Sequence, residues 1–195
     1  MSAWMVRILG LGGGARSGAS GGARLAPWLV GALVIQRLGE VRFAKANERA
    51  AREAGAVEHG ARHYPLFFVL HFAWLAGIVW ESRRAGRPFS AGWLAAAVLM
   101  QPLRIATMRT LGEQWTTRVM IRPGVSRVDR GLYRWCKQPA YGAVTVDLMV
   151  TPLAVGAVRT AAAGSLANAA LLGLLRLPAE RRAEATRSLP QPGPC

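Results

Sequence analysis

Apolar residues gather into five long runs along the chain, and most charged residues lie between these runs. The runs cover residues 25–43, 65–80, 89–108, 141–158 and 160–177. The shortest, residues 65–80, reaches about 24 Å as a helix at ~1.5 Å per residue, a little less than the ~30 Å hydrocarbon core of a bilayer. Helices of this length are typical of bundles that hide their polar positions. The pattern therefore predicts an all-α, polytopic integral membrane helical bundle of about five transmembrane helices.

Some charged residues lie inside the apolar runs, and those in the first and fourth runs bear on function. Arg37 and Glu40 are three residues apart and share one helical face. Because a charge inside the bilayer is costly, we expect them to pair with each other, to face the bundle or to lie near the membrane boundary. Asp147 lies six residues beyond Tyr141 in the fourth run. An acid at this depth is either a functional residue or one that hydrogen-bonds to a neighbouring helix.

The segment between the first two runs, residues 44–63, predicts an amphipathic, Ala-rich helix that ends near Gly55, with Glu48 and Arg52 paired at the i,i+4 spacing. His59 and His63 are four residues apart, but Gly60 separates them and no zinc-protease pattern accompanies them, so we assign no metal site. The domain boundaries follow from composition: residues 1–24 form a flexible Gly-rich tail, residues 25–184 the membrane domain, and residues 185–195 a disordered tail.

Composition separates two classes of basic protein. The chain is 52% hydrophobic and 18% charged, with a formal net charge of +15. Nucleic-acid-binding proteins display their cations on a soluble face, which five apolar runs exclude, so we expect no nucleic-acid partner. With five spans, seventeen of the 25 Lys and Arg residues fall on one side of the membrane and seven on the other. The richer side is predicted to be cytoplasmic, and membrane lipids are the expected surroundings.

Two polar segments emerge on this cytoplasmic side, namely the basic loop of residues 109–140 and the segment after the fifth run. Arg176 and Glu180 lie four apart and would share a face on an unbroken helix, where the arginine holds an anion and the acid accepts protons. Pro178 lies between them and either interrupts that helix or starts a second one. The alternative interpretation of the pair is a boundary arginine and a solvated acid.

The residues of these segments resemble a known family in their order and spacing. Gly131-Leu-Tyr133-Arg134, Lys137-Gln-Pro-Ala-Tyr141, the intramembrane acid Asp147, and Arg176 with Glu180 together resemble the isoprenylcysteine carboxyl methyltransferase family. The compact bacterial branch, which includes alkylpyrone methyltransferases, is the most similar. The resemblance covers roughly residues 33–184. It implies an all-helical membrane enzyme that uses S-adenosylmethionine without a Rossmann domain and acts on a lipophilic substrate.

The resemblance also implies roles for individual residues. The implied cofactor-binding residues are Val128, Tyr133, Gln138, Pro139, Tyr141 and Glu180. Arg176 matches the arginine that orients the substrate carboxylate, and Asp147 is the candidate base for an enolic hydroxyl. We expect methylation of a carboxylate, as in isoprenylcysteine, or of an enolic hydroxyl, as in alkylpyrones.

The sequence departs from the family pattern in four ways. Lys137-Gln138 replaces a basic-His pair, Ala140 an Asn, and Asp147 a Glu, while Pro178 and Arg181 stand where a second arginine and a second acid often occur. The alternative hypothesis is therefore a non-catalytic membrane homologue that keeps the bundle around a degenerate cofactor pocket.

Overall fold

The computed structural model describes residues 21–122 and 124–187 of the chain. The predicted flexible tail at residues 1–24 therefore lies mostly outside the described residues, as does the predicted disordered tail beyond residue 187. At both ends the helices extend past the predicted domain boundaries. The first helix already includes Gly21, and the last continues to Arg187.

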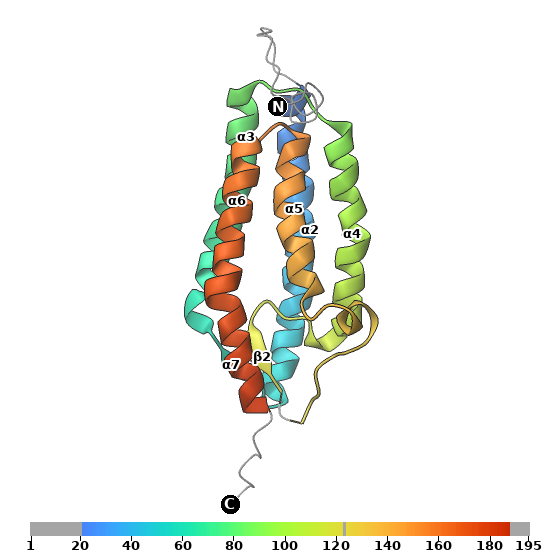
Figure 1. Cartoon of the computed structure of the whole chain (residues 1–195), viewed down its shortest axis with the longest axis vertical. Coiled ribbons are helices and arrows are strands. Elements are labelled where there is room, and N and C mark those ends of the chain that lie inside the picture. Colours follow the sequence, from blue (N-terminus) through green and yellow to red (C-terminus); the bar gives the residue numbers. More distant parts are fainter. Residues whose placement is uncertain (1–20, 123, 188–195) are drawn as a thin grey trace, which may run out of the picture.

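Five helical rods dominate the described part of the chain. They are α2 (Gly21–Glu53), α3 (Tyr64–Ala85), α4 (Ala91–Leu111), α5 (Pro139–Ala154) and a last rod made of three consecutive segments. In this last rod α6 (Val158–Leu171) continues through a π-helical turn, η4 (Leu172–Arg176), into α7 (Leu177–Arg187). The rods run side by side along the long axis of the molecule (Figure 1). The prediction of a predominantly helical fold is confirmed.

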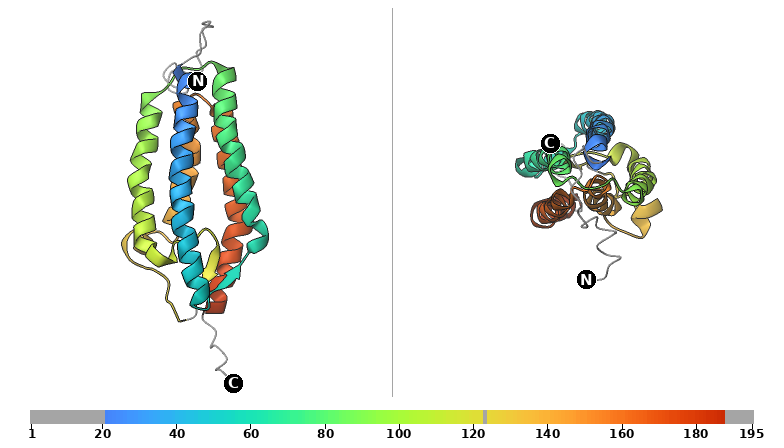
Figure 2. Two further views of the ribbon diagram at one scale, coloured as in Figure 1. Left: turned by 180° about the vertical axis from the view of Figure 1, so that it is seen from behind. Right: turned by 90° about the horizontal axis from the view of Figure 1, so that it is seen from above.

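The rods form a ring when the molecule is seen along its axis (Figure 2). Neighbouring pairs are α2 with α3, α3 with α6, α6 with α5, and α5 with α4. The α3–α4 and α5–α6 connections lie at the same end as the start of α2, and the longer loops lie at the opposite end (Figure 1). We call this opposite end the loop end.

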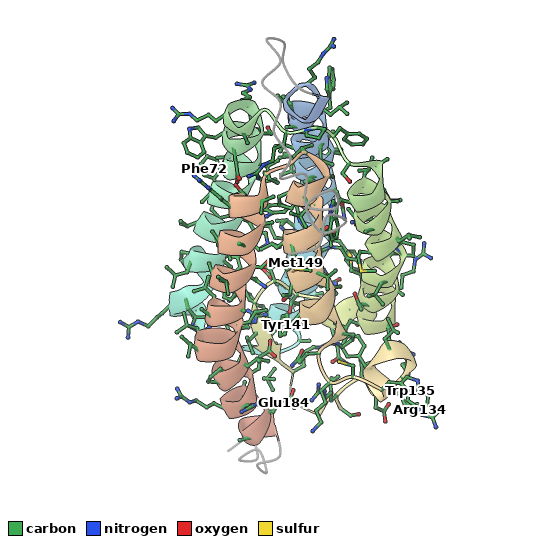
Figure 3. The ribbon with its side chains drawn as sticks, turned by 45° about the horizontal axis from the view of Figure 1, so that its top comes forward. Phe72, Arg134, Trp135, Tyr141, Met149 and Glu184 are labelled. Atoms are coloured by element: carbon green, nitrogen blue, oxygen red, sulfur yellow. The ribbon has the colours of Figure 1, made fainter. Side chains whose placement is uncertain are left out.

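The bundle buries several polar side chains and exposes many apolar ones. Its core contains Trp74 and Leu148, and the Trp74 indole Nε1 donates a 3.0 Å hydrogen bond to the Leu148 carbonyl. Large apolar side chains are more than two-thirds exposed on the outside, including Ile35, Phe68, Phe72, Leu99, Leu166 and Leu174. Phe72 points outward in Figure 3. An apolar surface of this extent is suited to lipid rather than water.

Two of the rods have the length and apolar composition of membrane spans in the described residues, one over Ala61–Ala85 and the other over Val158–Ala185. The middle of α2 contains Arg37 and Glu40, which lower the apolar character of this helix. α5 has only 16 residues. The two long apolar helices are consistent with a membrane protein, whereas the predicted number of five spans remains a prediction.

The segment after the first predicted span differs from expectation. Residues 44–53 continue α2 without a break instead of forming a separate helix. Val57–His59 then forms strand β1, which pairs antiparallel with β2 (Val119–Ile121), so the fold contains a small sheet that the all-α prediction missed. The expected Glu48–Arg52 pair is not the arrangement found, because Arg52 pairs with Glu58 on β1.

Pro178 does not separate Arg176 from Glu180. A proline removes one helical hydrogen bond and crowds the carbonyl four residues earlier. Here the π-helical turn at Leu172–Arg176 lies immediately before it, and π turns are a known way to re-form hydrogen bonds around such a residue. The helix therefore continues through Pro178, and the two charged side chains share a face.

Candidate active site

Four of the predicted site residues contact one another at the loop end of the bundle. The Gln138 amide Nε2 donates a 2.8 Å hydrogen bond to Glu180 Oε2. The Tyr141 hydroxyl donates to Glu180 Oε1, and Arg176 Nε lies 3.0 Å from the same oxygen. Arg176 Nε also donates to the Tyr141 hydroxyl oxygen at 2.9 Å. We call these four residues the Glu180 cluster; Tyr141 is labelled in Figure 3.

The local sequence explains how the start of α5 and the last rod each position two residues of this cluster. Pro139 begins α5, where its missing N–H costs no helical hydrogen bond. Gln138 consequently precedes the helix and Tyr141 lies in its first turn. On the last rod, Arg176 and Glu180 are paired at the i,i+4 spacing, with side chains only 11% and 18% exposed. The cluster is therefore largely shielded from solvent. In such surroundings charge-assisted hydrogen bonds are stronger than they are in water.

Arg176 has a second contact that fixes its orientation. Its Nη1 donates a 3.0 Å hydrogen bond to the carbonyl oxygen of Thr117, in the loop before β2. Thr117 in turn is held by Glu48 of α2, whose Oε1 accepts hydrogen bonds from the Thr117 backbone N–H at 2.9 Å and from its hydroxyl at 2.6 Å. The Arg118 backbone N–H adds a third hydrogen bond to this oxygen at 3.2 Å.

Asn47, the neighbour of Glu48, holds the start of the same loop. Its Nδ2 donates to the carbonyl oxygens of Gly112 at 2.9 Å and of Trp115 at 2.8 Å. The end of α2 thus positions the loop that orients Arg176. Sequence reasoning missed this role of Glu48, because it assigned the carboxylate to a pair with Arg52. The buried Glu48 finds its partners about 70 residues further along the chain, and local spacing carries no signal for such contacts.

Tyr133 lies close to the cluster without joining its hydrogen bonds. It belongs to the short 3-10 turn η3 (Gly131–Arg134), and its buried hydroxyl has no hydrogen-bond partner within residues 21–122 and 124–187. Burial, together with the negative charge of Glu180, raises the pKa of Tyr133 to about 12. The phenol therefore stays protonated at neutral pH and is available to donate a hydrogen bond. Val128 lies in the loop before η3 and is partly buried.

Asp147 belongs to a different group of side chains deeper in the bundle. It is 2% exposed, accepts a 2.5 Å hydrogen bond from Arg37 Nη2, and accepts another at 2.9 Å from the Thr151 hydroxyl. Arg37 also pairs with Glu40 at 2.9 Å, and Glu40 pairs with Arg104 at 2.5 Å. Arg37 and Glu40 therefore both pair with each other and face the bundle. The structure joins Asp147 to α2 and α4, not to Arg176.

Comparisons with known proteins give one family and one relative. The family model described as the isoprenylcysteine carboxyl methyltransferase (ICMT) family matches residues 93–185, which include the whole Glu180 cluster but not Glu48. The chain is also similar to the uncharacterized protein YpbQ of Bacillus subtilis (strain 168). The two are 34% identical over 158 residues, which make up 80% of this chain and 94% of the Bacillus protein. No solved structure matches the chain.

Proposed function

Because the chain belongs to the isoprenylcysteine carboxyl methyltransferase family, we propose that it is an S-adenosylmethionine-dependent O-methyltransferase of the membrane. The proposed substrate is lipophilic and carries a carboxylate or an enolic hydroxyl as the methyl acceptor. The observation that carries this proposal is the convergence of Gln138, Tyr141 and Arg176 on Glu180 at one end of an apolar-surfaced bundle.

The chemistry of these side chains fits S-adenosylmethionine. The cofactor has a cationic sulfonium and ammonium, ribose hydroxyls and a carboxylate. Glu180 supplies a carboxylate for a cation or a hydroxyl, and Gln138 and Tyr141 supply hydrogen-bond donors beside it. The buried Tyr133 hydroxyl has an unused hydrogen-bonding capacity next to the cluster, as expected of a residue that contacts a ligand. Pro139 and Val128 would border the same ligand through their backbone.

The proposed reaction asks the protein mainly to position the acceptor. When bound, the cofactor supplies an activated methyl group on its sulfonium sulfur. Arg176, held by Thr117 and only 11% exposed, orients the acceptor oxygen in a site from which water is largely excluded. A carboxylate acceptor needs no general base. An enolic hydroxyl needs one, and Asp147 is the candidate; its engagement by Arg37 and Thr151 favours a carboxylate substrate.

We further propose that five rods cross the membrane and that the Glu180 cluster lies at the cytoplasmic face. The distribution of cations supports this topology, because the loop end of the bundle carries the three segments that are richest in Lys and Arg (Figure 1). A lipophilic substrate reaches the cluster sideways from the bilayer, past the exposed apolar side chains of the rods.

The departures from the family pattern support a second candidate, a homologue that keeps the bundle without catalysis. Two features of the structure weigh against it. The Gln138 amide contacts Glu180 in spite of the His-to-Gln difference, and the helix passes through Pro178 with Arg176 and Glu180 paired. Ala140, by contrast, has no side chain that replaces the amide of the family Asn.

Methyl transfer distinguishes the two candidates. Detergent-purified protein is incubated with S-adenosylmethionine labelled in its methyl group and with a prenylated cysteine or a long-chain alkylpyrone, and label in the lipophilic product is counted. We expect transfer that Arg176→Ala abolishes and Arg182→Ala preserves, since Arg182 is exposed on the same rod. Absence of transfer together with absence of cofactor binding supports the non-catalytic candidate, whose cofactor pocket is degenerate. Absence of cofactor binding overturns the proposal.

A further inference from the structure

The loop that carries Tyr133 and Gln138 also presents an exposed, basic side. Four consecutive residues, Arg134 to Lys137, are exposed, and the indole of Trp135 is 85% exposed. The Arg134 guanidinium lies over the Trp135 ring at 5.7 Å from its centre. Both side chains project outward from the loop end of the bundle (Figure 3). An exposed tryptophan beside cations is the arrangement found at membrane–water interfaces, where the amphipathic indole is enriched.

Cations concentrate around this tryptophan. Arg127, Arg130, Arg134 and Lys137 are all exposed, whereas residues 126–137 contain a single acid, Asp129. The Arg127 guanidinium donates a 2.5 Å hydrogen bond to the Lys137 carbonyl, which draws the two ends of the segment together. We call the surface formed by Arg127, Arg130, Arg134, Trp135 and Lys137 the basic loop face.

The basic loop face lies beside the apolar surface of the bundle rather than beyond it. The η3 turn packs against the last turns of α4, where a Cβ built on Gly131 would come within 3.1 Å of the Thr110 hydroxyl. The apolar outer side of α4, with Val98, Leu99 and Ile105, continues upward from this point. A patch at this level faces the boundary between lipid tails and headgroups if α4 spans the membrane.

We propose that the basic loop face is a docking surface for anionic phospholipid headgroups of the adjacent leaflet. Its charge is complementary to phosphate groups, and clusters of Lys and Arg next to a membrane helix favour anionic lipids. Tryptophan favours the interface, with its ring at headgroup level. The aliphatic stems of the arginine and lysine side chains lie along apolar surface while their charges reach phosphate.

Docking on lipid is expected to change the cofactor affinity of the Glu180 cluster, because the same loop leads into it. This expectation rests on the proposed function. Tyr133 precedes the exposed residues and Gln138 follows them, so both ends of the exposed segment lead into the candidate cofactor site. Headgroup contacts that order the segment also order these two side chains. Cofactor affinity is then expected to rise on an anionic surface, by about fivefold at most for each cation engaged, since only the part of the lipid contact that depends on this ordering is transmitted to the cofactor.

Cys136 offers a probe within the segment itself, because it is exposed and not in a disulfide. In a Cys195→Ser background, an environment-sensitive fluorophore on Cys136 reports the surroundings of the basic loop face. The protein is placed in nanodiscs of phosphatidylcholine alone or of equal parts phosphatidylcholine and phosphatidylglycerol. We expect a blue shift of emission in the anionic discs that is reversed by high salt. The same emission in both lipids overturns the proposal.

A matched pair of variants separates docking from a general charge effect. Arg130→Gln/Arg134→Gln removes two cations of the basic loop face. Arg83→Gln/Arg84→Gln removes two exposed cations at the opposite end of the bundle, where Arg84 also lies over a tryptophan, Trp80. Docking predicts that the first variant loses the blue shift and the second keeps it. An equal emission shift in the two variants overturns the proposal.

Cofactor titrations in the same discs test the consequence separately. Tighter binding of S-adenosylmethionine in anionic discs, lost in Arg130→Gln/Arg134→Gln, supports coupling of lipid and cofactor. A blue shift with unchanged cofactor affinity supports docking and contradicts the coupling. Absence of cofactor binding in both lipids overturns the proposed function, while the fluorophore alone still decides whether the loop docks on lipid.

Discussion

The side-chain amide of Gln138 donates a 2.8 Å hydrogen bond to the carboxylate of Glu180, joining the start of α5 to α7. In the family that this chain resembles, a histidine occupies the position of Gln138. The glutamine keeps a donor of similar reach at this point, so the pairing of the two helices does not depend on an imidazole.

Replacing Gln138 tests whether that donor is what the site requires. We expect Gln138→Ala to weaken S-adenosylmethionine binding about tenfold or more, because a largely buried carboxylate loses one of its donors at a cost of about 1–3 kcal/mol. Gln138→His restores a donor and is expected to bind within about threefold of the wild type. Calorimetric titration of the purified variants measures the S-adenosylmethionine affinity of each. Equal affinity of Gln138→Ala and the wild type would contradict the assignment.

Tyr133 is predicted to act as a neutral hydrogen-bond donor. Its pKa of about 12 lies above the ordinary value of about 10, so the folded protein favours the protonated phenol. The associated stability is present below pH ~10 and is lost as the pH rises through about 12. We expect the ultraviolet difference spectrum between wild type and Tyr133→Phe to show that the phenolate of Tyr133 forms near pH 12. Formation of this phenolate near pH 10 argues against burial of the ring. At neutral pH, Tyr133→Phe is expected to fold normally and to bind the cofactor more weakly.

Glu48 is predicted to position Arg176 through the Thr117 loop. Glu48→Gln removes the charge that three donors share, and hydrogen bonds to charged groups contribute about 1.5–3 kcal/mol. Since Arg176 orients the acceptor, we expect kcat/KM for the lipophilic substrate to fall about tenfold or more while cofactor affinity changes little. Glu53→Gln, an exposed acid at the end of the same helix, is the control. Unchanged turnover in Glu48→Gln rules out the positioning role.

Asp147 is predicted to stabilise the bundle through its buried pair with Arg37. Removing one partner of an isolated buried pair costs about 3–5 kcal/mol, but Arg37 keeps its pair with Glu40, so we expect a smaller loss of about 1–3 kcal/mol from the broken hydrogen bond. Asp147→Asn is expected to lower the thermal unfolding temperature markedly, and the Arg37→Gln/Asp147→Asn double variant should lose less than the sum of the two single losses. If Asp147 instead acts as a catalytic base, stability changes little and methylation of an enolic hydroxyl disappears.

The helical bundle and half of the site followed from local patterns in the sequence. Apolar runs of helical length predict rods, and the start of α5 follows from Pro139. The shared face of Arg176 and Glu180 follows from the i,i+4 spacing once the helix is continuous. Sequence alone left that continuity open, because Pro178 normally interrupts a helix and the preceding π turn has no simple sequence signal.

Contacts between distant segments were the part that local patterns missed. β1 and β2 have three residues each, too few to show an alternating pattern. Glu48 has a suitable cation four residues away, so its hydrogen bonds to Thr117 and Arg118 were not expected. For Asp147, a hydrogen bond to a neighbouring helix was one of two expectations, but its partner Arg37, 110 residues earlier in the chain, was not predicted.

Calorimetric titration of S-adenosylmethionine into the detergent-purified protein is the most direct test of the account as a whole. We predict saturable binding in the micromolar range that is lost in Glu180→Ala and in Tyr141→Ala, and that is retained in Glu53→Ala, which alters an exposed acid away from the cluster. Absence of binding at millimolar cofactor, or undiminished binding in Glu180→Ala, would contradict the proposal that the cofactor is held where α5 and α7 meet.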